Sequence, residues 1–256
     1  DMREILRTQS SDVPGDAGLV LGFAETAAEV EALQRLRYDV YTKEMNVIFP
    51  DAVDGIDKDK YDEFCEHLMV CDERNNQVVG TYRILSPEHA KAAGGYYSES
   101  EFDISSLDSD RHLLTECGRS CTHPDYRGGP AIMLLWTGLA RYLFMHNYRY
   151  MLGCASVSLA DGGIQAAEVW RAAKQEIIRH PELPQVKPLL PYPLDKLPVL
   201  EGDAQVKVPP LIKGYLKIGA RICGEPAWDK NFNSADFPVI IDAQFMDKRY
   251  LKHFGL

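Results

Sequence analysis

The sequence predicts a layered α/β or α+β domain, and three observations support this. The predicted elements run strand, helix, loop, three strands, helix, strand, helix and then one or two strands, an order typical of stacked sheet and helix layers. The 256 residues are 45% hydrophobic and 26% charged, an ordinary globular composition with room for one large domain or a domain with extensions. No run of 18 apolar residues occurs, so no segment is predicted to span a membrane.

The N-terminal part predicts a strand followed by a helix. Residues 1 to 17 are expected to be a flexible lead-in, and a short strand is predicted at 18 to 24. Thr26 and Glu29 have the spacing of a capping box, so a helix should begin there. Arg37 falls on the apolar face of that helix, where a cation needs a partner or a ligand. Arg37 is therefore a candidate binding residue, with a structural ion pair as the alternative.

An acidic, turn-rich loop at 49 to 60 and a β-hairpin follow. Long ordered loops often carry function. The spacing of Asp57, Asp59 and Asp62 resembles a calcium loop only superficially, because the glycine and the closing glutamate stand at the wrong offsets; no metal site is predicted. The hairpin strands are predicted at 66 to 72 and 77 to 85, and Arg83 lies inside the second of them.

A strand, a glycine-rich turn and a helix form the centre of the chain. After a polar insertion at 86 to 111, a strand at 113 to 121 carries Glu116 and Arg119. A bulge at Gly118 would bring both charges to one face. The turn then leads into an almost continuously apolar helix at 131 to 145. Such a turn collects free backbone N–H groups and a positive dipole end, which suits a phosphate or pyrophosphate group.

The remaining chain predicts a smaller set of elements and a three-part organisation. A strand at 149 to 157, a helix at 165 to 178, a short helix at 211 to 220 and strands at 221 to 223 and 237 to 245 are expected. The segment from 181 to 210 holds eight of the fifteen prolines and should be extended. We therefore predict a lead-in at 1 to 17, a core at 18 to 180, and an extension at 181 to 256 that completes the sheet and covers the core.

Charge and cysteine content exclude several classes of function. With 28 basic and 38 acidic residues the net charge is −10, which argues against non-specific nucleic-acid binding. The six cysteines form no C-x-x-C pair and are interpreted as reduced core thiols, which predicts a cytoplasmic protein. The first residues lack an apolar signal core, so secretion is not indicated.

Charged side chains are predicted to converge on one cleft. The set consists of Arg37, Asp59, Asp62, Arg83, Glu116 and Arg119. Gathering six charges would be costly without a charged ligand. An amino acid, with its carboxylate and ammonium groups, is such a ligand.

These motifs resemble a known superfamily. The turn Pro-x-x-Arg-Gly-Gly-Pro-Ala resembles the pyrophosphate loop of the GNAT acyltransferases, and the spacing of LRYDVY, D-x-x-D, GTYRIL and E-x-x-R resembles that of acyl-homoserine-lactone synthases. The run QRLRYDVY, YDEFCEHLMV, VVGTYRIL, GGYYSESEFD and ECGRSCTHPDYR is most similar to the hemolysin-like bacterial acyltransferases that include the L-ornithine Nα-acyltransferases. The resemblance covers about residues 20 to 175. It implies a GNAT-like central mixed, mostly antiparallel sheet flanked by helices, with the proline-rich segment as a C-terminal extension.

The resemblance also implies an activity. The protein would transfer a fatty acyl group from acyl carrier protein to the α-amine of ornithine, the first step of ornithine-lipid synthesis. A 3-hydroxyacyl group is the expected type. Acyl-coenzyme A is the alternative donor, and no permanently bound cofactor is expected. Alternatives are an N-acyl amino acid synthase acting on glycine or tyrosine, a lactone signal synthase, and a membrane-active hemolysin without enzymatic activity. The expected location is the cytoplasm, with the inner face of the membrane as a further expectation; the oligomeric state stays open.

Roles for individual residues follow from the same resemblance. Glu116 would be the general base for the amine, with His67 and His123 as alternatives. Arg37 and Arg119 would hold the amino-acid carboxylate or the acyl carbonyl, Asp59 and Asp62 would face the ammonium group or order the loop, and Arg83 would anchor the cleft. The phosphate of the donor would be held by Arg127, Gly128, Gly129 and Ala131.

Overall fold

The computed structural model describes residues 2–8, 18–201 and 210–256, which fall into two compact units. The first unit contains the chain up to Gly94 together with Cys117–His146, and the second contains Gly95–Glu116 and Asn147–Leu256. Strand β6 (Leu114–Thr122) therefore gives its first three residues to the second unit and the rest to the first. Each unit is described by itself.

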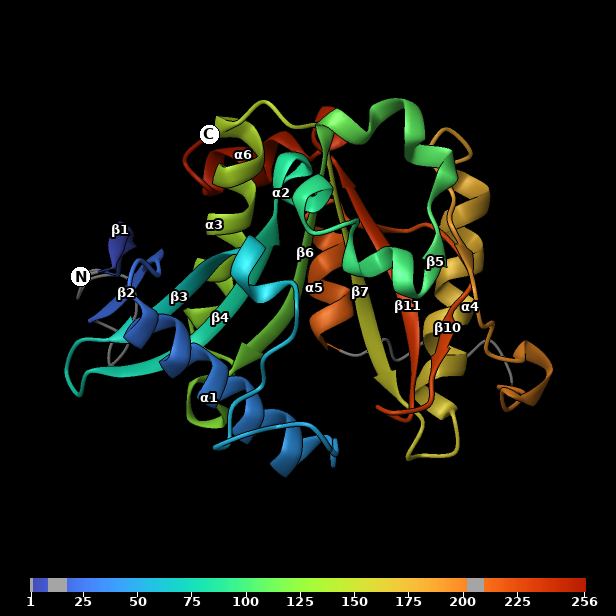
Figure 1. Cartoon of the computed structure of the whole chain (residues 1–256). Coiled ribbons are helices and arrows are strands. Elements are labelled where there is room, and N and C mark those ends of the chain that lie inside the picture. The colour runs from blue at the N-terminus through green and yellow to red at the C-terminus, as the bar shows by residue number, and fades with distance from the viewer. Residues whose placement is uncertain (1, 9–17, 202–209) are drawn as a thin grey trace. The chain divides into compact units, whose positions relative to one another are not determined.

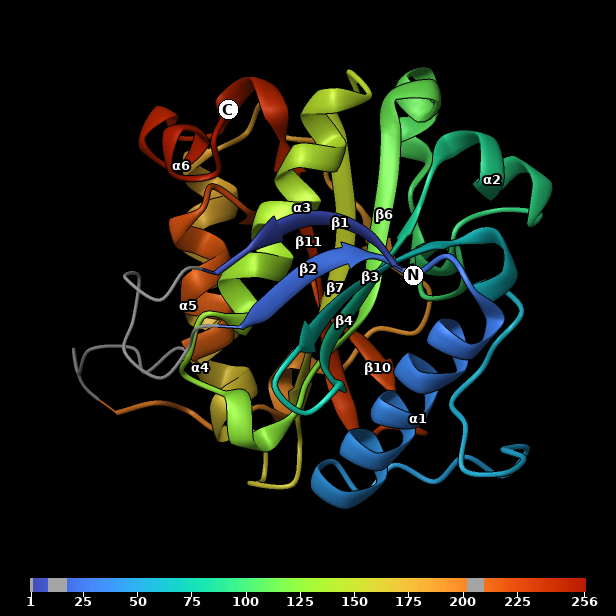
Figure 2. The same cartoon turned by 90° about the vertical axis from the view of Figure 1, so that its left-hand side faces the viewer.

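The first unit is built on a sheet with the strand order β1-β2-β3-β4-β6 (Figure 1). Its strands besides β6 are β1 (Arg3–Arg7), β2 (Leu19–Phe23), β3 (Glu66–Asp72) and β4 (Gln77–Leu85). Successive pairs from β1 to β4 are antiparallel, and Figure 2 shows β1 and β2 as neighbouring arrows. Strand β1 lies inside the segment expected as a lead-in, whereas residues 9 to 17 of that segment lie outside the described residues.

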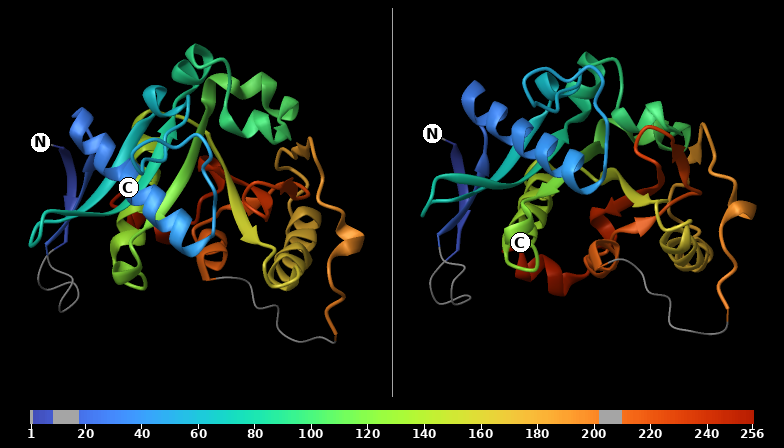
Figure 3. Two further views of the ribbon diagram at one scale, coloured as in Figure 1. Left: turned by 60° about the horizontal axis from the view of Figure 1, so that its bottom comes forward. Right: turned by 90° about the horizontal axis from the view of Figure 1, so that it is seen from below.

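Two helices cover opposite faces of this sheet (Figure 3). Helix α1 (Ala27–Glu44) begins at the predicted capping box, in which Thr26 accepts a hydrogen bond from the Glu29 amide and Glu29 accepts one from the Thr26 amide. Helix α3 (Ala131–Met145) has the predicted bounds. It lies close to β3 at Gly138, where an added Cβ would stand 2.9 Å from the side chain of Leu68. Glycine at this position therefore permits the close contact of helix and strand.

The hairpin of β3 and β4 is confirmed at both predicted strands. The two strands pair antiparallel from Glu66–Ile84 to Asp72–Gln77, with a register shift between Val70 and Cys71. The turn contains Asn76 with a φ of 59°, a left-handed conformation that asparagine adopts more readily than most residues. This hairpin carries Arg83 on β4 and Asp72 at the end of β3.

The second unit contains the beginning of β6 and the strands β7 (Tyr150–Ser158), β9 (Arg221–Ile222), β10 (Ala227–Asp229) and β11 (Ser234–Asp242). Strands β6 and β7 are parallel over three residue pairs, from Leu114–Tyr150 to Glu116–Leu152. Strand β11 runs antiparallel to β7, β9 and β10. Helix α4 (Ile164–Arg179) packs Ala166, Ala167, Val169 and Ala173 on a core that includes Phe237 of β11 and Ile212 of α5 (Pro210–Lys217).

The polar insertion is more structured than the sequence indicates. It contains α2 (Pro87–Ala92), the short 3₁₀ helices η2 (Tyr97–Ser100) and η3 (Ser105–Leu113), and β5 (Phe102–Asp103), which pairs with β8 (Lys187–Pro188) of the proline-rich segment. Elements of two to nine residues with irregular turns have no periodicity to reveal them. The other short elements are η1 (Asp62–Phe64), η4 (Pro124–Tyr126), η5 (Leu194–Lys196), η6 (Ala243–Phe245) and α6 (Lys248–His253).

The predicted fold class is confirmed: the strands are mixed, mostly antiparallel, and flanked by helices. In the part of the chain that the structure describes, no helix is both long enough and apolar enough to cross a lipid bilayer. The six cysteines all lie in the part of the chain that the structure describes, and none of them forms a disulfide there.

Candidate active site

Arg37 of α1 is fully buried and bonded to two aspartates of the acidic loop. Its Nε donates to Asp57 Oδ2 at 3.0 Å, and Nη1 and Nη2 donate to the two carboxylate oxygens of Asp62 at 3.0 and 2.7 Å. Nη2 also donates to the Asp57 carbonyl oxygen. Four N–H groups of the guanidinium are thus satisfied by the loop, and only 1% of the side chain is exposed. The position of Arg37 on the helix predicts this burial. Its hydrogen-bond partners are two aspartates of the chain, as in the structural ion pair that the sequence leaves as an alternative.

Asp62 is the centre of this arrangement. Besides Arg37, it accepts hydrogen bonds from the side chain of Gln34 and the amide of Asp59, and it contacts Arg83 Nη1 at 3.0 Å. Burial alone would raise the pKa of Asp62, but the hydrogen bonds and charge of Arg37 outweigh it and hold the pKa well below its ordinary value. Asp62 is therefore ionised throughout the physiological range.

Arg83 of β4 connects the sheet to the same loop. Its Nη1 donates to Asp59 Oδ1 at 2.6 Å as well as to Asp62. Its guanidinium carbon lies 5.6 Å from the centre of the Tyr61 ring, within cation–π range. Burial would raise the pKa of Asp59, but the bond from Arg83 lowers it. The β4 arginine thus anchors the loop, in agreement with its predicted position.

Arg119 of β6 is the most exposed arginine of the group. Its Nε lies 3.7 Å from Asp57 Oδ2 and its Nη2 lies 3.6 Å from Asp59 Oδ2, and 17% of its side chain is exposed. Arg119 has a φ of 51°, a left-handed conformation that costs a non-glycine residue about 1 to 2 kcal/mol. This left-handed residue directly follows Gly118, where the sequence predicts a bulge.

The structure brings together a balanced charge network in the first unit. Its members are Arg37, Asp57, Asp59, Asp62, Arg83 and Arg119. Three guanidinium groups face three carboxylates, so the network carries no large net charge of its own. The spacing of Asp57 from Asp59 and Asp62, which resembles only a calcium loop, does not indicate the role of Asp57 in the network. The signal was present, because a buried arginine opposite an acidic loop can engage more than one carboxylate.

His67 belongs to the same unit and stabilises the loop. It is buried, pairs across the sheet with Arg83, and its Nε2 lies 2.9 Å from the Asp62 carbonyl oxygen. Because a carbonyl oxygen only accepts, Nε2 carries the hydrogen. Burial lowers the pKa of His67, so the ring is neutral at neutral pH. His123, the other alternative base, caps the η4 turn by accepting a hydrogen bond from the Asp125 amide.

Glu116 is buried in the second unit and held by the insertion. Its Oε1 accepts from the Tyr97 amide at 3.0 Å and its Oε2 accepts from the Ser98 amide at 2.7 Å. It is also the last residue of β6 in the parallel pairing with β7. The two backbone bonds fix the orientation of the carboxylate. Sequence reasoning found Glu116 but not its amide donors, which lie in the turn that follows Gly94-Gly95.

The glycine-rich turn joins η4 to α3 in the first unit. Gly128 has a φ of 75°, a conformation that favours glycine. Pro130 is the N-cap of α3 and makes no side-chain cap bond, which leaves the first-turn N–H groups for another acceptor. Arg127 forms an ion pair with Glu44 and donates to the Thr122 carbonyl at 3.2 Å, so its guanidinium is directed toward α1 and β6. Gly128, Gly129 and Ala131 are placed at the turn and helix start as predicted.

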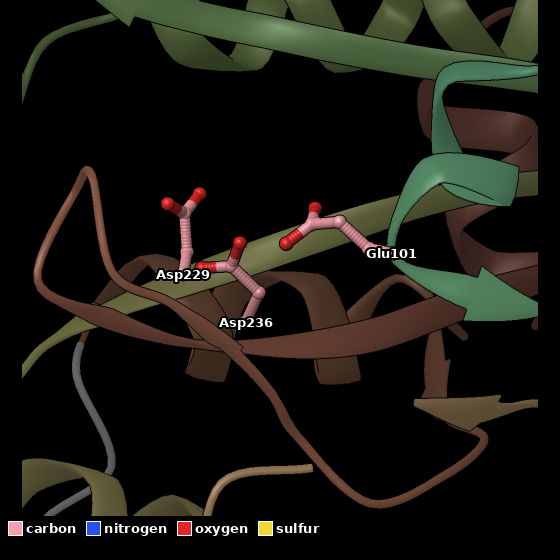
Figure 4. A group of neighbouring side chains, drawn as sticks. All are labelled: Glu101, Asp229 and Asp236. Carbon is pink, nitrogen blue, oxygen red and sulfur yellow. The ribbon is translucent and has the colours of Figure 1, made fainter. Parts of the chain in front are cut away.

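A second acidic group lies in the other unit. Glu101, Asp229 and Asp236 direct their carboxylates toward one another (Figure 4). One carboxylate oxygen from each residue lies within 4.8 Å of the other two. Burial and the neighbouring Asp236 raise the pKa of Glu101 to about 10, and burial with the same neighbour raises the pKa of Asp229 to about 6. A proton retained on Glu101 relieves the repulsion between these carboxylates. No metal was predicted from the sequence, and this group was not singled out.

Comparisons with known proteins place the chain in a family. A protein-family model for the acetyltransferase (GNAT) domain matches residues 36–137. This range includes the charge network, Glu116 and the glycine-rich turn. The chain is 32% identical to the L-ornithine N(alpha)-acyltransferase of Rhizobium meliloti (strain 1021), with 99% of this chain and 90% of the relative covered. It is 33% identical to the enzyme of the same name from Brucella abortus (strain 2308), covering 93% and 89%. The structure of FeeM, an N-acyl amino acid synthase from uncultured soil microbes, shares the fold, with a TM-score of 0.54, 12% identity, and coverage of 90% of this chain and 98% of that one.

The family model and the similar enzymes together define an amide-forming acyltransferase of the GNAT type. Within that class, the chain belongs to the family of the L-ornithine N(alpha)-acyltransferases. The family expected from the sequence motifs is therefore confirmed.

Proposed function

We propose that the protein transfers a fatty acyl group, 3-hydroxyacyl in the preferred case, from acyl carrier protein to the α-amine of L-ornithine. The observation that carries this proposal is the similarity to L-ornithine N(alpha)-acyltransferases over nearly the whole chain. The product would be the first intermediate of ornithine-lipid synthesis. The reaction would take place in the cytoplasm, at the inner face of the membrane where lipid precursors are used.

The proposed chemistry is direct attack of the amine on the thioester. An α-amine with an ordinary pKa near 8 is mostly protonated at neutral pH, and only its neutral form attacks. Glu116 accepts one proton from the ammonium group. The nitrogen then bonds to the acyl carbon, the carbon–sulfur bond breaks, and the thiolate takes up the second proton that the nitrogen loses. The products are an amide and the free thiol of the phosphopantetheine arm.

The exposure of the side chains suggests how roles divide within the charge network. Arg37 and Asp62 are bonded to each other, and only 1% and 2% of their side chains are exposed. Both are therefore better suited to hold the loop in place than to contact the substrate. Arg119 and Asp59, with 17% and 22% exposed, are better suited to contact the substrate carboxylate and ammonium groups. Arg83 anchors the loop. The phosphate of the donor is assigned to the N–H groups of Gly128, Gly129 and Ala131, with Arg127 at the start of the turn.

Purified protein tests the proposal against its closest alternatives. Thiol release from acyl carrier protein and from acyl-coenzyme A would be measured with ornithine, glycine and tyrosine as acceptors. We expect release with ornithine and the carrier-bound donor. Faster release with glycine or tyrosine would make the protein a different N-acyl amino acid synthase, and formation of a lactone product would make it a signal synthase. Lysis of vesicles without any thiol release would favour the hemolysin alternative.

A further inference from the structure

Tyr126 fastens the start of the glycine-rich turn to the β3–β4 hairpin. Its hydroxyl donates to Asp72 Oδ2 at 2.7 Å and lies 3.3 Å from Asn75 Nδ2, which donates to it. The Tyr126 ring also packs edge to face on His123, with ring centres 5.7 Å apart. Tyr126 is the residue directly before Arg127, so this contact fixes the point where the turn begins.

Asp72 is a rigid partner for this contact. It is 2% exposed and stands at the end of β3, paired with Gln77. Its Oδ1 accepts from the amide and Nε of Arg74, and its Oδ2 accepts from Arg74 Nη2 as well as from Tyr126. These bonds, with that of Arg74 first, lower the pKa of Asp72 to about 2. The carboxylate is therefore charged at neutral pH, and a hydrogen bond to a charged acceptor is stronger than one between neutral groups.

The other end of the turn is fixed by packing. Ala131 is fully buried at the first position of α3, and the Leu134 amide donates to the Pro130 carbonyl at 2.9 Å. The backbone from 127 to 130 thus runs between two fixed points, the Tyr126–Asp72 contact and the start of α3. Donor binding at this turn depends on backbone N–H groups, which bind more tightly when their directions are set before the ligand arrives.

We propose that Tyr126 and Asp72 are positioning residues that preorganise the turn for the phosphate of the acyl donor. The inference rests on the proposed function in one respect, namely that the turn binds the phosphopantetheine phosphate. Neither side chain touches the donor; both act through the backbone of the turn. Removal of the Tyr126 hydroxyl leaves the ring and its packing in place but frees the entry to the turn, so the donor must order it on binding.

The test compares Tyr126→Phe with the wild type and with Tyr38→Phe as a matched control. Tyr38 lies in the same unit, and its ring packs on Phe49 with centres 5.9 Å apart. Dissociation constants are measured for coenzyme A and for holo-acyl carrier protein, and KM is measured for the acyl donor and for the amine. We expect Tyr126→Phe to weaken binding of both phosphopantetheine probes roughly three- to tenfold, a part of what one charge-assisted hydrogen bond contributes. Tyr38→Phe should bind as the wild type does, and KM for the amine should stay constant.

Asp72→Asn provides a second variant, which should weaken donor binding in the same direction. The double variant with Tyr126→Phe should weaken it by less than the product of the two single effects. Unchanged donor binding with a lower Tm in Tyr126→Phe would overturn the proposal, since a merely structural contact gives that result. Equal weakening of donor and amine would overturn it too. Donor binding needs no amine, so failure to acylate ornithine would leave the inference standing, whereas a wild type that binds neither probe would remove it.

Discussion

At the scale of single residues, Arg37 and Arg119 have the same chemistry but different surroundings. Arg37 donates four hydrogen bonds to Asp57 and Asp62 and is fully buried, whereas Arg119 stands at the exposed side of the same network. Removing one partner of a buried, bonded ion pair leaves an uncompensated charge. Replacement of Arg37 should therefore lower the stability of the fold, whereas replacement of Arg119 should weaken substrate binding.

Alanine variants at three arginines test this difference. Arg37→Ala should lower the free energy of unfolding by about 3 to 5 kcal/mol, because Asp57 and Asp62 lose the guanidinium that donates four hydrogen bonds to them. Arg119→Ala should keep the fold and raise KM for the amino acid about 10- to 100-fold, the effect of losing one charge-assisted contact. Arg35→Ala, at an exposed position that pairs with Glu31, is the control and should change little. Thermal unfolding measures the change in stability, and steady-state kinetics measure the change in KM. Equal, small changes in all three variants would contradict the different roles given to Arg37 and Arg119.

Glu116→Gln tests the proposed base. We expect turnover to fall by about 10²- to 10⁴-fold, the usual loss for one acid–base group. The defect should shrink as pH rises, because more of the amine is then already neutral. Turnover is measured from about pH 7 to 9.5, with thermal unfolding to verify the fold and exposed Glu63→Gln as the matched control. Near wild-type activity at pH 7 would mean that another group takes the proton, and His123 would be examined next.

The sequence indicated most residues of the charge network but not how they pair. Like Glu116, which is not part of this network, Arg83 and Arg119 could be selected because they lie in predicted strands, and Arg37 because it lies on the inward face of a helix. Asp59 and Asp62 could be selected from their D-x-x-D spacing at the end of the acidic loop. Their pairing could not be predicted, since it depends on how the acidic loop folds back onto α1. The Tyr97 and Ser98 amides that hold Glu116 were also missed, because any residue supplies a backbone N–H group and no side-chain pattern marks it.

At the scale of elements, the acidic loop owes its order to ion pairs that depend on pH. Arg37 holds the pKa of Asp62 below its ordinary value, so the folded state binds that proton less readily than the unfolded state does. The stabilisation is therefore fully present above the ordinary carboxyl pKa near 4 and is lost as pH falls through the lower folded value. The loop should loosen in acid before the rest of the unit unfolds.

Denaturation at a series of pH values tests this loop. The free energy of unfolding of the wild type should fall steeply below about pH 4, whereas Asp62→Asn should be less stable at pH 7 and fall less steeply in acid. Asp51→Asn changes an exposed aspartate near the same loop and should follow the wild type. If Asp62→Asn and the wild type lost stability in parallel below pH 4, Asp62 would not be the group whose ionisation holds the loop.

Long, regular elements could be predicted and short ones could not. The hairpin strands and α3 have the predicted bounds, because alternation and a long apolar run leave little ambiguity. Strand β11 begins at Ser234, three residues before the predicted start, and α5 ends at Lys217 rather than 220. The ends of elements depend on tertiary hydrogen bonds, such as the pairing of Ser234 with Ser158, that sequence periodicity does not contain.

At the scale of the whole molecule, the net charge of −10 bears on the choice of acyl donor. Acyl carrier proteins are acidic, so encounter requires a local basic surface. Two arginines of the chain, Arg127 and Arg149, form ion pairs with Glu44 and Asp242. Helix α6 carries Lys248, Arg249 and Lys252, all exposed. Arg249 also forms an ion pair, with Asp247, but the gathering of three cations on one short helix makes α6 the stronger candidate for a docking surface.

Charge reversal on α6 tests this surface. Arg249→Glu and Lys252→Glu should lower kcat/KM for the carrier-bound donor and leave a coenzyme A donor nearly unaffected. The wild-type preference for the carrier protein should weaken from about 20 to 300 mM salt, because exposed charges are screened beyond about 8 Å at physiological ionic strength. Lys91→Glu, at an exposed lysine of α2, is the control. Equal use of both donors with the same flat salt dependence would leave a coenzyme A-dependent acyltransferase.

The central claim is that the protein acylates the α-amine of ornithine. The most direct measurement is mass spectrometry of lipids extracted from a host that expresses the chain, beside the same host with the Glu116→Gln variant. We expect accumulation of ornithine carrying one fatty acyl group on its α-nitrogen, with little or none in the variant. Accumulation of acylated glycine or tyrosine instead, or of ornithine acylated on its side-chain nitrogen, would contradict it.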